Sequence, residues 1–249
     1  MNSTSIEKLL SHRKAKPKGM PGDVVEAKRR AELSQMIAHD YMRFEHLRDM
    51  IFHLVTAHAL DEHEVISTHP DMAPLLLEME RFGLIHTANS DKVKIDSRAR
   101  RYLSGGWLEE LAWLASQEAG ADEAVFSQVL AWEYEGFRGE NEIDLIMRKG
   151  GRLALVSCKA LKSELDVNDR KLRNKLMDAV YETDSLVDHF GKHGDRVALV
   201  VSTGLHDELR HVPRYQALMG KAAVLNVHMI PLEEIVWDRL VHAMHALLD

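Results

Sequence analysis

The sequence predicts an α/β protein in which a small helical module precedes a larger layer of strands and helices. Two apolar runs, 140–149 and 152–159, flank a Gly-Gly pair and predict a β-hairpin, because Gly-Gly accepts the positive φ angles of a two-residue turn. The continuous apolar run at 197–202 predicts a central strand that is covered on both faces. Apolar residues at helical spacing from Tyr41 onward predict that helices precede both.

Length and composition limit the class of protein. A chain of 249 residues can form one large domain, or a small and a medium one. The net charge of −7 gives no overall basic surface for coating nucleic acid, although an enzyme that collects divalent cations tolerates an acidic balance. A single cysteine excludes an internal disulfide, and the 15 histidines are scattered without an HExxH motif. Neither a membrane span nor a secretory leader is found, so we expect a cytoplasmic protein with no membrane partner.

Residues 1–40 are expected to form a basic, flexible arm. Lysine and arginine recur along this segment, and Pro17, Pro21 and Gly22 interrupt any helix. One interpretation is a mobile arm with no further role. The other is a basic arm that reaches nucleic acid or a partner subunit.

Residues 41–103 are expected to form a winged-helix-like domain. The expected elements are a helix from Tyr41, a short helix capped by Asp61, a helix from Pro70 to Gly83, and strands at 84–87 and 92–95. Winged helices often bind DNA through a recognition helix. Here that helix is acidic, with Glu78 and Glu80 against Arg81, so a structural or dimerising role is favoured over DNA reading.

Residues 104–249 are expected to form the larger domain. Besides the hairpin and the central strand, the expected elements are helices at 107–118, 168–190, 205–218 (kinked at Pro213) and 231–248, and strands at 125–135 and 223–230. Helices and strands that follow one another in this way are typical of an α/β layer.

The expected hairpin register places charged groups together. With Gly150 and Gly151 as the turn, the facing pairs are Lys149 with Arg152, Leu145 with Val156, Asp144 with Ser157, Ile143 with Cys158, and Glu142 with Lys159. Side chains alternate along a strand and facing Cβ atoms stand about 5 Å apart. The polar members of these pairs are therefore expected to share one face, and Ile143 and Leu145 the other. Two carboxylates beside an ammonium on an apolar hairpin indicate an active site.

An acid, a turn and a strand that ends in x-Lys, here Asp144 followed by Ser157-Cys158-Lys159, resemble the core of the PD-(D/E)xK nuclease superfamily. The segments 105–110, 141–144 and 181–191 resemble the winged-helix and nuclease part of CARF-linked, cyclic-oligonucleotide-activated effector nucleases of type III CRISPR systems. The resemblance implies a winged-helix module followed by a restriction-endonuclease-like domain. It also implies a homodimer and a metal-dependent nuclease that acts in defence against foreign nucleic acid.

The sequence departs from the family pattern in two places. Ser157 replaces the glutamate of the ExK motif, so one metal-binding carboxylate is missing. No sensor domain of the kind that these effectors carry fits before Tyr41, so a separate sensor or activator subunit is expected as a partner.

The resemblance implies hydrolysis assisted by Mg²⁺ or Mn²⁺, which lowers the pKa of a bound water and acts as a Lewis acid. Asp144 is expected as the first ligand, with Glu142 or Glu110 as the second, and the backbone carbonyl of Cys158 as a third oxygen donor. Lys159 would orient the attacking water or stabilise the developing negative charge.

Glu109 and Glu110 both stand in the first turn of the helix at 107–118, where the helix dipole favours carboxylates. Either both only stabilise the end of the helix, or one of them reaches the metal. Glu110 is the expected ligand of the two.

Some members of the superfamily that the sequence resembles replace this acid with one from the following helix, which implies Glu164, Asp178 and Glu182 as the candidates here. Glu182 stands one turn after Asp178, so both can face the sheet. The basic flank of the same helix, which would contact the phosphates of nucleic acid or face solvent, consists of Lys171, Arg173 and Lys175.

Three functions stay open. The first is a metal-dependent nuclease acting on DNA, and on RNA as well, because a phosphate-centred site distinguishes the two poorly. The second is a catalytically degenerate nuclease fold that binds nucleic acid or a partner protein, which the serine at position 157 favours. The third is a winged-helix regulator, against which the gathering of Glu142, Asp144 and Lys159 argues.

Overall fold

The structure is a computed structural model that describes residues 5–57, 70–87, 93–166, 168–207 and 209–249. Within these residues the centre of the molecule is a six-stranded sheet in the order β1-β4-β5-β6-β7-β10. Its strands are β1 (Ala15–Lys18), β4 (Glu123–Tyr134), β5 (Phe137–Lys149), β6 (Arg152–Lys159), β7 (Arg196–Val201) and β10 (Val227–Ile230). Neighbours are antiparallel from β1 to β6 and parallel from β6 to β10. The strand predicted at 197–202 is thus an inner strand of a mixed sheet.

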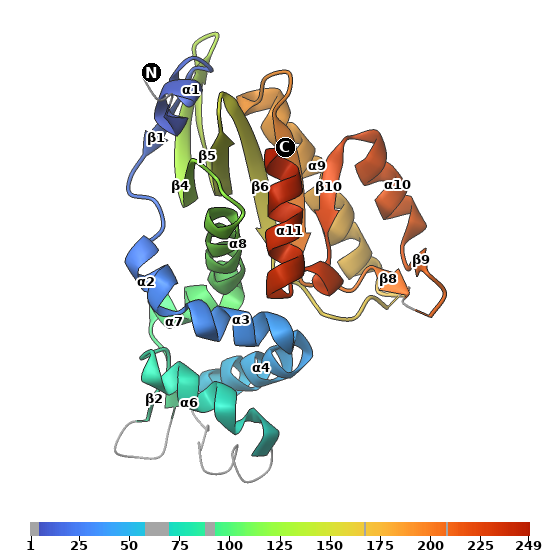
Figure 1. Cartoon of the computed structure of the whole chain (residues 1–249). Helices are drawn as coiled ribbons and strands as arrows, with labels where there is room; N and C mark the ends of the chain where they lie inside the picture. The colour runs from blue at the N-terminus through green and yellow to red at the C-terminus, as the bar shows by residue number, and fades with distance from the viewer. Residues whose placement is uncertain (1–4, 58–69, 88–92, 167, 208) are drawn as a thin grey trace.

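Helices cover both faces of this sheet (Figure 1). On one face lie α8 (Trp107–Glu118) and α11 (Trp237–Leu248), and on the other α9 (Arg170–Phe190) and α10 (Gln216–Val224). Each face buries its own apolar cluster, named here the α8 cluster and the α9 cluster. The predicted helix at 107–118 has the predicted bounds. None of the described helices is long and apolar enough to cross a membrane.

An N-terminal helical layer extends the α8 cluster. It consists of α2 (Val24–Arg29), α3 (Ala31–His39), α4 (Tyr41–Ala57), the turn η1 (Pro70–Met72) and α6 (Ala73–Arg81), and it lies below α8 in Figure 1. Phe44 on α4 and Trp107 on α8 meet edge to face, with ring centroids 5.8 Å apart, and both side chains are fully buried. The layer therefore shares one apolar core with the α8 face of the sheet.

Residues 5–39, which are expected to belong to a flexible arm, are folded instead. Here α1 (Ile6–Ser11) lies against the sheet, and β1 pairs with the edge of β4. The guanidinium of Arg13 forms an ion pair with Asp195 at 2.5 Å, and both side chains are almost completely buried. The arm prediction fails because basic residues alternate with apolar ones, such as Leu10, that have a place in the core.

Part of the expected winged helix is described. The structure contains α4, α6 and a short antiparallel pair, β2 (His86–Thr87) with β3 (Val93–Lys94). After α6 the chain turns at Gly83, whose φ of +67° is the left-handed conformation common after helix C-termini. The short second helix expected after Asp61 lies outside the described residues, so the winged helix stays a prediction.

The helix predicted at 205–218 is wrong. The chain forms a small hairpin of β8 (His206–Asp207) and β9 (Val212–Pro213), and the helix α10 begins only at Gln216. Proline has no N–H to donate within a helix. The Glu233 carboxylate accepts the backbone N–H groups of Leu205 and His206 at the start of this segment.

The β5–β6 hairpin has the predicted register from the turn as far as Leu145 opposite Val156. Gly150 in the turn has a φ of +60°, as predicted for a Gly-Gly loop. At the next position the carboxylate of Asp144, rather than a backbone carbonyl, accepts the N–H of Cys158 at 2.6 Å. The described pairing of β5 with β6 ends here. The place where it ends, around Asp144 on β5 and Ser157, Cys158 and Lys159 on β6, is named the fork.

The predicted alternation of faces breaks down at the same point. Leu145 is buried in the α8 cluster, whereas Ile143 is buried in the α9 cluster, so the expectation that they share a face is wrong. On the neighbouring strand, Ser127 lies level with Asp144 and has a φ of +47°, which is unusual for a residue with a side chain. Both strands are thus irregular where Asp144 enters the fork.

Candidate active site

The fork gathers the charged groups of the hairpin around Asp144. Burial raises the pKa of the Asp144 carboxyl above its ordinary value, although the N–H of Cys158 and the ammonium of Lys159 oppose the shift. The negative charges of Glu142 and Glu182 raise this pKa further. A carboxylate that is partly desolvated and crowded by other acids is suited to binding a cation.

Lys159 forms an ion pair with an acid of α9, the helix on the face of the sheet opposite α8. Its Nζ lies 3.0 Å from Oε2 of Glu182 on α9. The structure thus brings Glu182, one of the acids predicted to compensate for Ser157, into the site. Glu164 and Asp178 are exposed, as Glu182 is, but neither is described in an ion pair with Lys159, and Ser157 itself is only 8% exposed.

Glu109 reaches the fork from the α8 side, although Glu110 was the expected ligand. The hydroxyl of Ser127 donates a hydrogen bond to its carboxylate. Burial and the charge of Asp144, opposed by that hydrogen bond, raise the pKa of Glu109 to about 7. The carboxyl groups of Glu109 on α8 and Asp144 on β5 are therefore close enough to interact electrostatically at the fork.

Glu110 pairs with Arg30 rather than with a group of the hairpin. Its Oε1 accepts from Nη2 of Arg30 at 2.6 Å and its Oε2 from Nε at 3.2 Å, so the pair is bidentate and largely buried. To choose between Glu109 and Glu110 from the sequence, one has to know which side of the helix faces the hairpin. Arg30, the partner that identifies Glu110 as structural, lies in a segment that is expected to be flexible. No local sequence signal separates the two glutamates, because Arg30 is eighty positions away.

Glu142 is held by a different cation than expected. The register predicts it opposite Lys159, but its Oε1 accepts from Nη2 of Arg101 at 2.7 Å. Arg101 ends the short helix α7 (Ser97–Arg101), which leads through η2 (Tyr102–Gly106) into α8. Glu142 stays near enough to Asp144 and Glu109 for its charge to raise the pKa of both.

The thiol of Cys158 is not a nucleophile in this setting. Burial raises its pKa well above the ordinary value, and the charges of Asp144 and Glu109 add to the shift. The thiol therefore stays protonated at neutral pH, whereas the thiolate is the reactive form.

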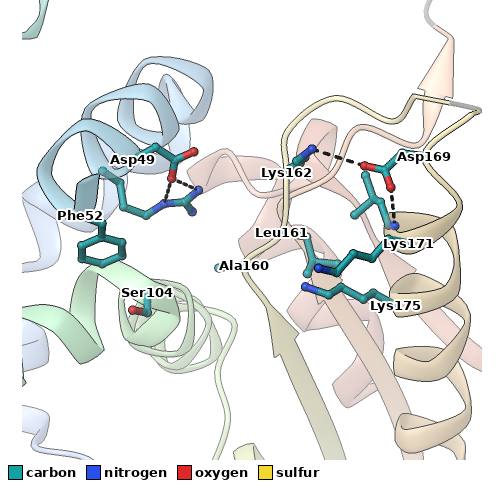
Figure 2. A pocket seen from close by; sticks show the side chains of 11 residues that line it. Asp49, Phe52, Ser104, Ala160, Leu161, Lys162, Asp169, Lys171 and Lys175 are labelled. Carbon is teal, nitrogen blue, oxygen red and sulfur yellow. Dashed lines mark hydrogen bonds and ion pairs between the residues drawn. The ribbon is translucent and has the colours of Figure 1, made fainter. Parts of the chain in front are cut away.

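A groove of about 430 Å³ begins where β6 ends (Figure 2). Its floor is formed by Ala160 and Leu161, which follow Lys159 directly, and its walls by α4 and the start of α9. From α9, the ammonium groups of Lys171 and Lys175 point into the groove in Figure 2. Neither of these ammonium groups forms an ion pair within the described part of the chain.

Arg173, the third residue of the predicted basic flank, does not line the groove. Its guanidinium lies over the ring of Tyr215, 4.9 Å from the ring centroid. Within the same helix it therefore faces another surface than Lys171 and Lys175. The structure brings together two of the three predicted phosphate-binding residues.

The fork offers few protein ligands for a hard divalent cation. Among the described residues, no group of three or more histidine, cysteine or acidic side chains is arranged to hold a metal ion. Mg²⁺, however, often takes one or two carboxylates and completes its shell with waters and substrate oxygens. Asp144 and Glu109 supply two carboxylates whose mutual repulsion a cation would relieve.

Comparisons with known proteins agree with this architecture. The fold resembles protein VC1899 from Vibrio cholerae, with a TM-score of 0.72, 15% identity, and coverage of 99% of this chain and 62% of that one. It also resembles Can2 from Sulfobacillus thermosulfidooxidans, solved in complex with cyclic tetra-adenylate, with a TM-score of 0.63, 12% identity, and coverage of 98% and 61%. The chain thus spans about three fifths of the length of each.

A comparison with curated protein sequences gives no match. The family model for the endonuclease domain of Card1-like proteins matches residues 96–243. This segment is more than half of the chain, and it contains Glu109, Asp144, Lys159 and Glu182. The chain therefore belongs to the Card1-like endonuclease domain family.

Proposed function

We propose that this chain is a metal-dependent endonuclease that hydrolyses phosphodiester bonds of DNA, with RNA as a second substrate. The observation that carries the proposal is that Asp144 and Lys159 lie at the fork with one acid from a helix on each face of the sheet. These acids are Glu109 on α8 and Glu182 on α9. Membership of an endonuclease family supports the reaction class.

In this proposal Asp144 and Glu109 hold Mg²⁺ or Mn²⁺, and the backbone carbonyl of Cys158 is a further candidate donor. The bound ion would supply an activated water and Lewis-acid stabilisation of the phosphate. Ser127 orients Glu109 through its hydroxyl, and the N–H of Cys158 orients Asp144. Both ligands are therefore held by the protein before a metal binds.

Lys159 binds the scissile phosphate and stabilises the charge that develops on its oxygens. Glu182 holds the ammonium near the fork, and it supplies a negative charge that Ser157 does not. Lys171 and Lys175 bind the phosphates next to the scissile one along the groove.

The second candidate function is a catalytically degenerate subunit that binds nucleic acid or a partner protein. One observation favours it: Ser157, in the position of the ExK glutamate, is buried and carries no charge. Such a subunit would bind through the groove and the fork without hydrolysis.

The regulation and setting of the enzyme are also proposals. We infer a cytoplasmic homodimer that acts in CRISPR-associated defence, with a winged-helix-like module at 41–103 and a sensor or activator as partner. The fold similarity to Can2, solved with cyclic tetra-adenylate, supports a test of that ligand class.

The deciding experiment is a cleavage assay on supercoiled plasmid, single-stranded DNA and RNA with Mn²⁺, Mg²⁺ or EDTA. We expect metal-dependent cleavage that Asp144→Ala and Lys159→Ala abolish while both variants stay folded. Binding of the same nucleic acids without cleavage under any metal would instead support the degenerate subunit.

A further inference from the structure

We propose that Tyr41 and Glu45 on α4 are positioning residues for the active site, through which the N-terminal helical layer sets the places of Lys159 and Glu109. The inference rests on the proposed function, which assigns catalysis to those two residues. The contacts are made by residues of α4, which are distant in the sequence from the charged groups of the fork.

The first contact is with the segment 160–163, which leaves β6 directly after Lys159. The hydroxyl of Tyr41 donates to the carbonyl of Leu161 at 2.7 Å. The carboxylate of Glu45 accepts from the backbone N–H of Ser163 at 3.0 Å and from its hydroxyl at 2.5 Å. Thus α4 holds this segment at two points within a few residues of Lys159.

The end of β7 holds the same segment, beside Tyr41. The Ser202 hydroxyl accepts from the N–H of Leu161 and donates to its carbonyl, both at 2.8 Å. The hydroxyl of Thr203 donates to the carbonyl of Lys162 at 2.7 Å. The segment that follows Lys159 is thus tied to α4 and to the end of β7 at a shared carbonyl, that of Leu161, so loss of the Tyr41 hydroxyl changes the bonding of this segment.

The second contact is with α8, which carries Glu109. The ring of Tyr41 stacks on that of Trp107, with centroids 5.4 Å apart and planes 28° apart. Trp107 is the first residue of α8, and both rings are almost completely buried. Tyr41 therefore touches the segment that directly follows Lys159 and the start of the helix that carries Glu109.

Arg48 fixes the direction of the hydrogen bond that Tyr41 donates. Its Nη1 donates to the Tyr41 hydroxyl oxygen at 3.1 Å, which leaves the hydroxyl proton for Leu161. Arg48 also lies 3.6 Å from Glu45 and lines the groove beside the fork. The two positioning residues and the wall of the groove thus form one polar network.

The test uses Tyr41→Phe, with Tyr102→Phe as the matched control. Tyr102 is equally buried, and its hydroxyl is bonded to that of Ser34 at 2.9 Å, away from the segment 160–163. In the active enzyme we expect Tyr41→Phe to lower kcat about five- to tenfold, the rate equivalent of one lost buried hydrogen bond, with KM unchanged. Tyr102→Phe should leave both constants unchanged. A rise in KM at constant kcat, or equal effects of the two variants, would overturn the proposal.

A second readout does not depend on cleavage. Lysines are dimethylated with ¹³C, and the Lys159 resonance is identified by its absence from Lys159→Arg. We expect Tyr41→Phe and Glu45→Ala to displace this resonance, and Glu45→Gln, which keeps an acceptor for Ser163, to restore its position. An unmoved resonance in both Tyr41→Phe and Glu45→Ala refutes the positioning role. If the wild-type protein cleaves nothing, the proposed function fails, and this readout still decides whether α4 positions Lys159.

Discussion

The carboxylate of Glu182 on α9 lies 3.0 Å from the ammonium of Lys159 on β6. In the proposed site, which has no carboxylate at Ser157, α9 thus supplies one beside Lys159. If the proposed site is correct, a helix position supplies the charge that the strand position 157 lacks.

Replacing Glu182 tests this relationship. Glu182→Gln removes the charge and keeps the size of the side chain, so we expect kcat to fall about tenfold, a loss of about 1.4 kcal/mol of transition-state stabilisation. Asp178→Asn, on the same exposed face of α9, is the control and should leave kcat unchanged. Equal losses in the two variants would show a general effect of charge on α9.

Restoring the acid at position 157 is the reciprocal change. Ser157→Glu places a carboxylate at a buried position near Asp144 and Lys159, so without metal we expect the melting temperature to fall by several degrees. With Mn²⁺ the new carboxylate gains a cation, so the rise in melting temperature on adding Mn²⁺ should exceed that of the wild type. Thermal unfolding with and without Mn²⁺ measures both, and an equal rise would place residue 157 outside the metal site.

The raised pKa of Glu109 gives a pH dependence of stability in metal-free protein. Between its ordinary value of 4.5 and its folded value of about 7, the folded state keeps a proton that the unfolded state has lost. The free energy of unfolding is therefore expected to fall as pH rises through this window. Urea unfolding in EDTA at pH 5 and pH 8 checks this. Glu109→Gln should be less sensitive to pH than the wild type, and an equal sensitivity would contradict the assignment.

Glu110, the neighbour of Glu109, should affect stability alone. Glu110→Ala leaves the guanidinium of Arg30 without its bidentate partner, so we expect the free energy of unfolding to fall by about 3 kcal/mol. Cleavage per folded molecule should not change, since both carboxylate oxygens of Glu110 are bonded to Arg30. Loss of cleavage in a variant that is still folded at the assay temperature would mean that Glu110 also serves the site.

The groove residues should control binding through charge. The double substitution Lys171→Ala and Lys175→Ala is expected to weaken binding of single-stranded and duplex DNA, and to reduce the slope of log K against log salt by up to about 2. Fluorescence anisotropy between 50 and 200 mM salt, with Asp144→Ala protein to prevent cleavage, measures the slope. Arg173→Ala removes a cation from the same helix outside the groove, and it should leave the slope near that of the parent.

The parts of the structure that depend on local chemistry could be predicted from the sequence. The Gly-Gly turn determines the register of β5 and β6 as far as Leu145 and Val156, because pairing propagates outward from a turn. Apolar periodicity gives the bounds of α8, and the spacing within α9 brings Glu182 to the fork. The positions of these residues follow from the sequence of their own helix or strand.

The parts that depend on distant partners could not be predicted. The reversal of faces at Asp144 arises with the positive φ of Ser127, which no local rule assigns to serine. Glu109 and Glu110 are distinguished by Arg30, eighty positions away, which binds one of them. The segment after Leu205 has helical spacing but is held by Glu233 in another conformation.

The buried ion pair of Arg13 with Asp195 restricts how the chain can be divided. Asp195 also accepts the N–H groups of Leu153 and Lys192 at 2.8 and 2.7 Å, so it anchors the start of both inner parallel strands, β6 and β7. A fragment that begins at residue 104 would bury this carboxylate without its cation and would leave the edge of β4, now covered by β1, free to pair with other chains. Such a fragment is expected to aggregate, so the catalytic half of the molecule has to be produced together with its first strand.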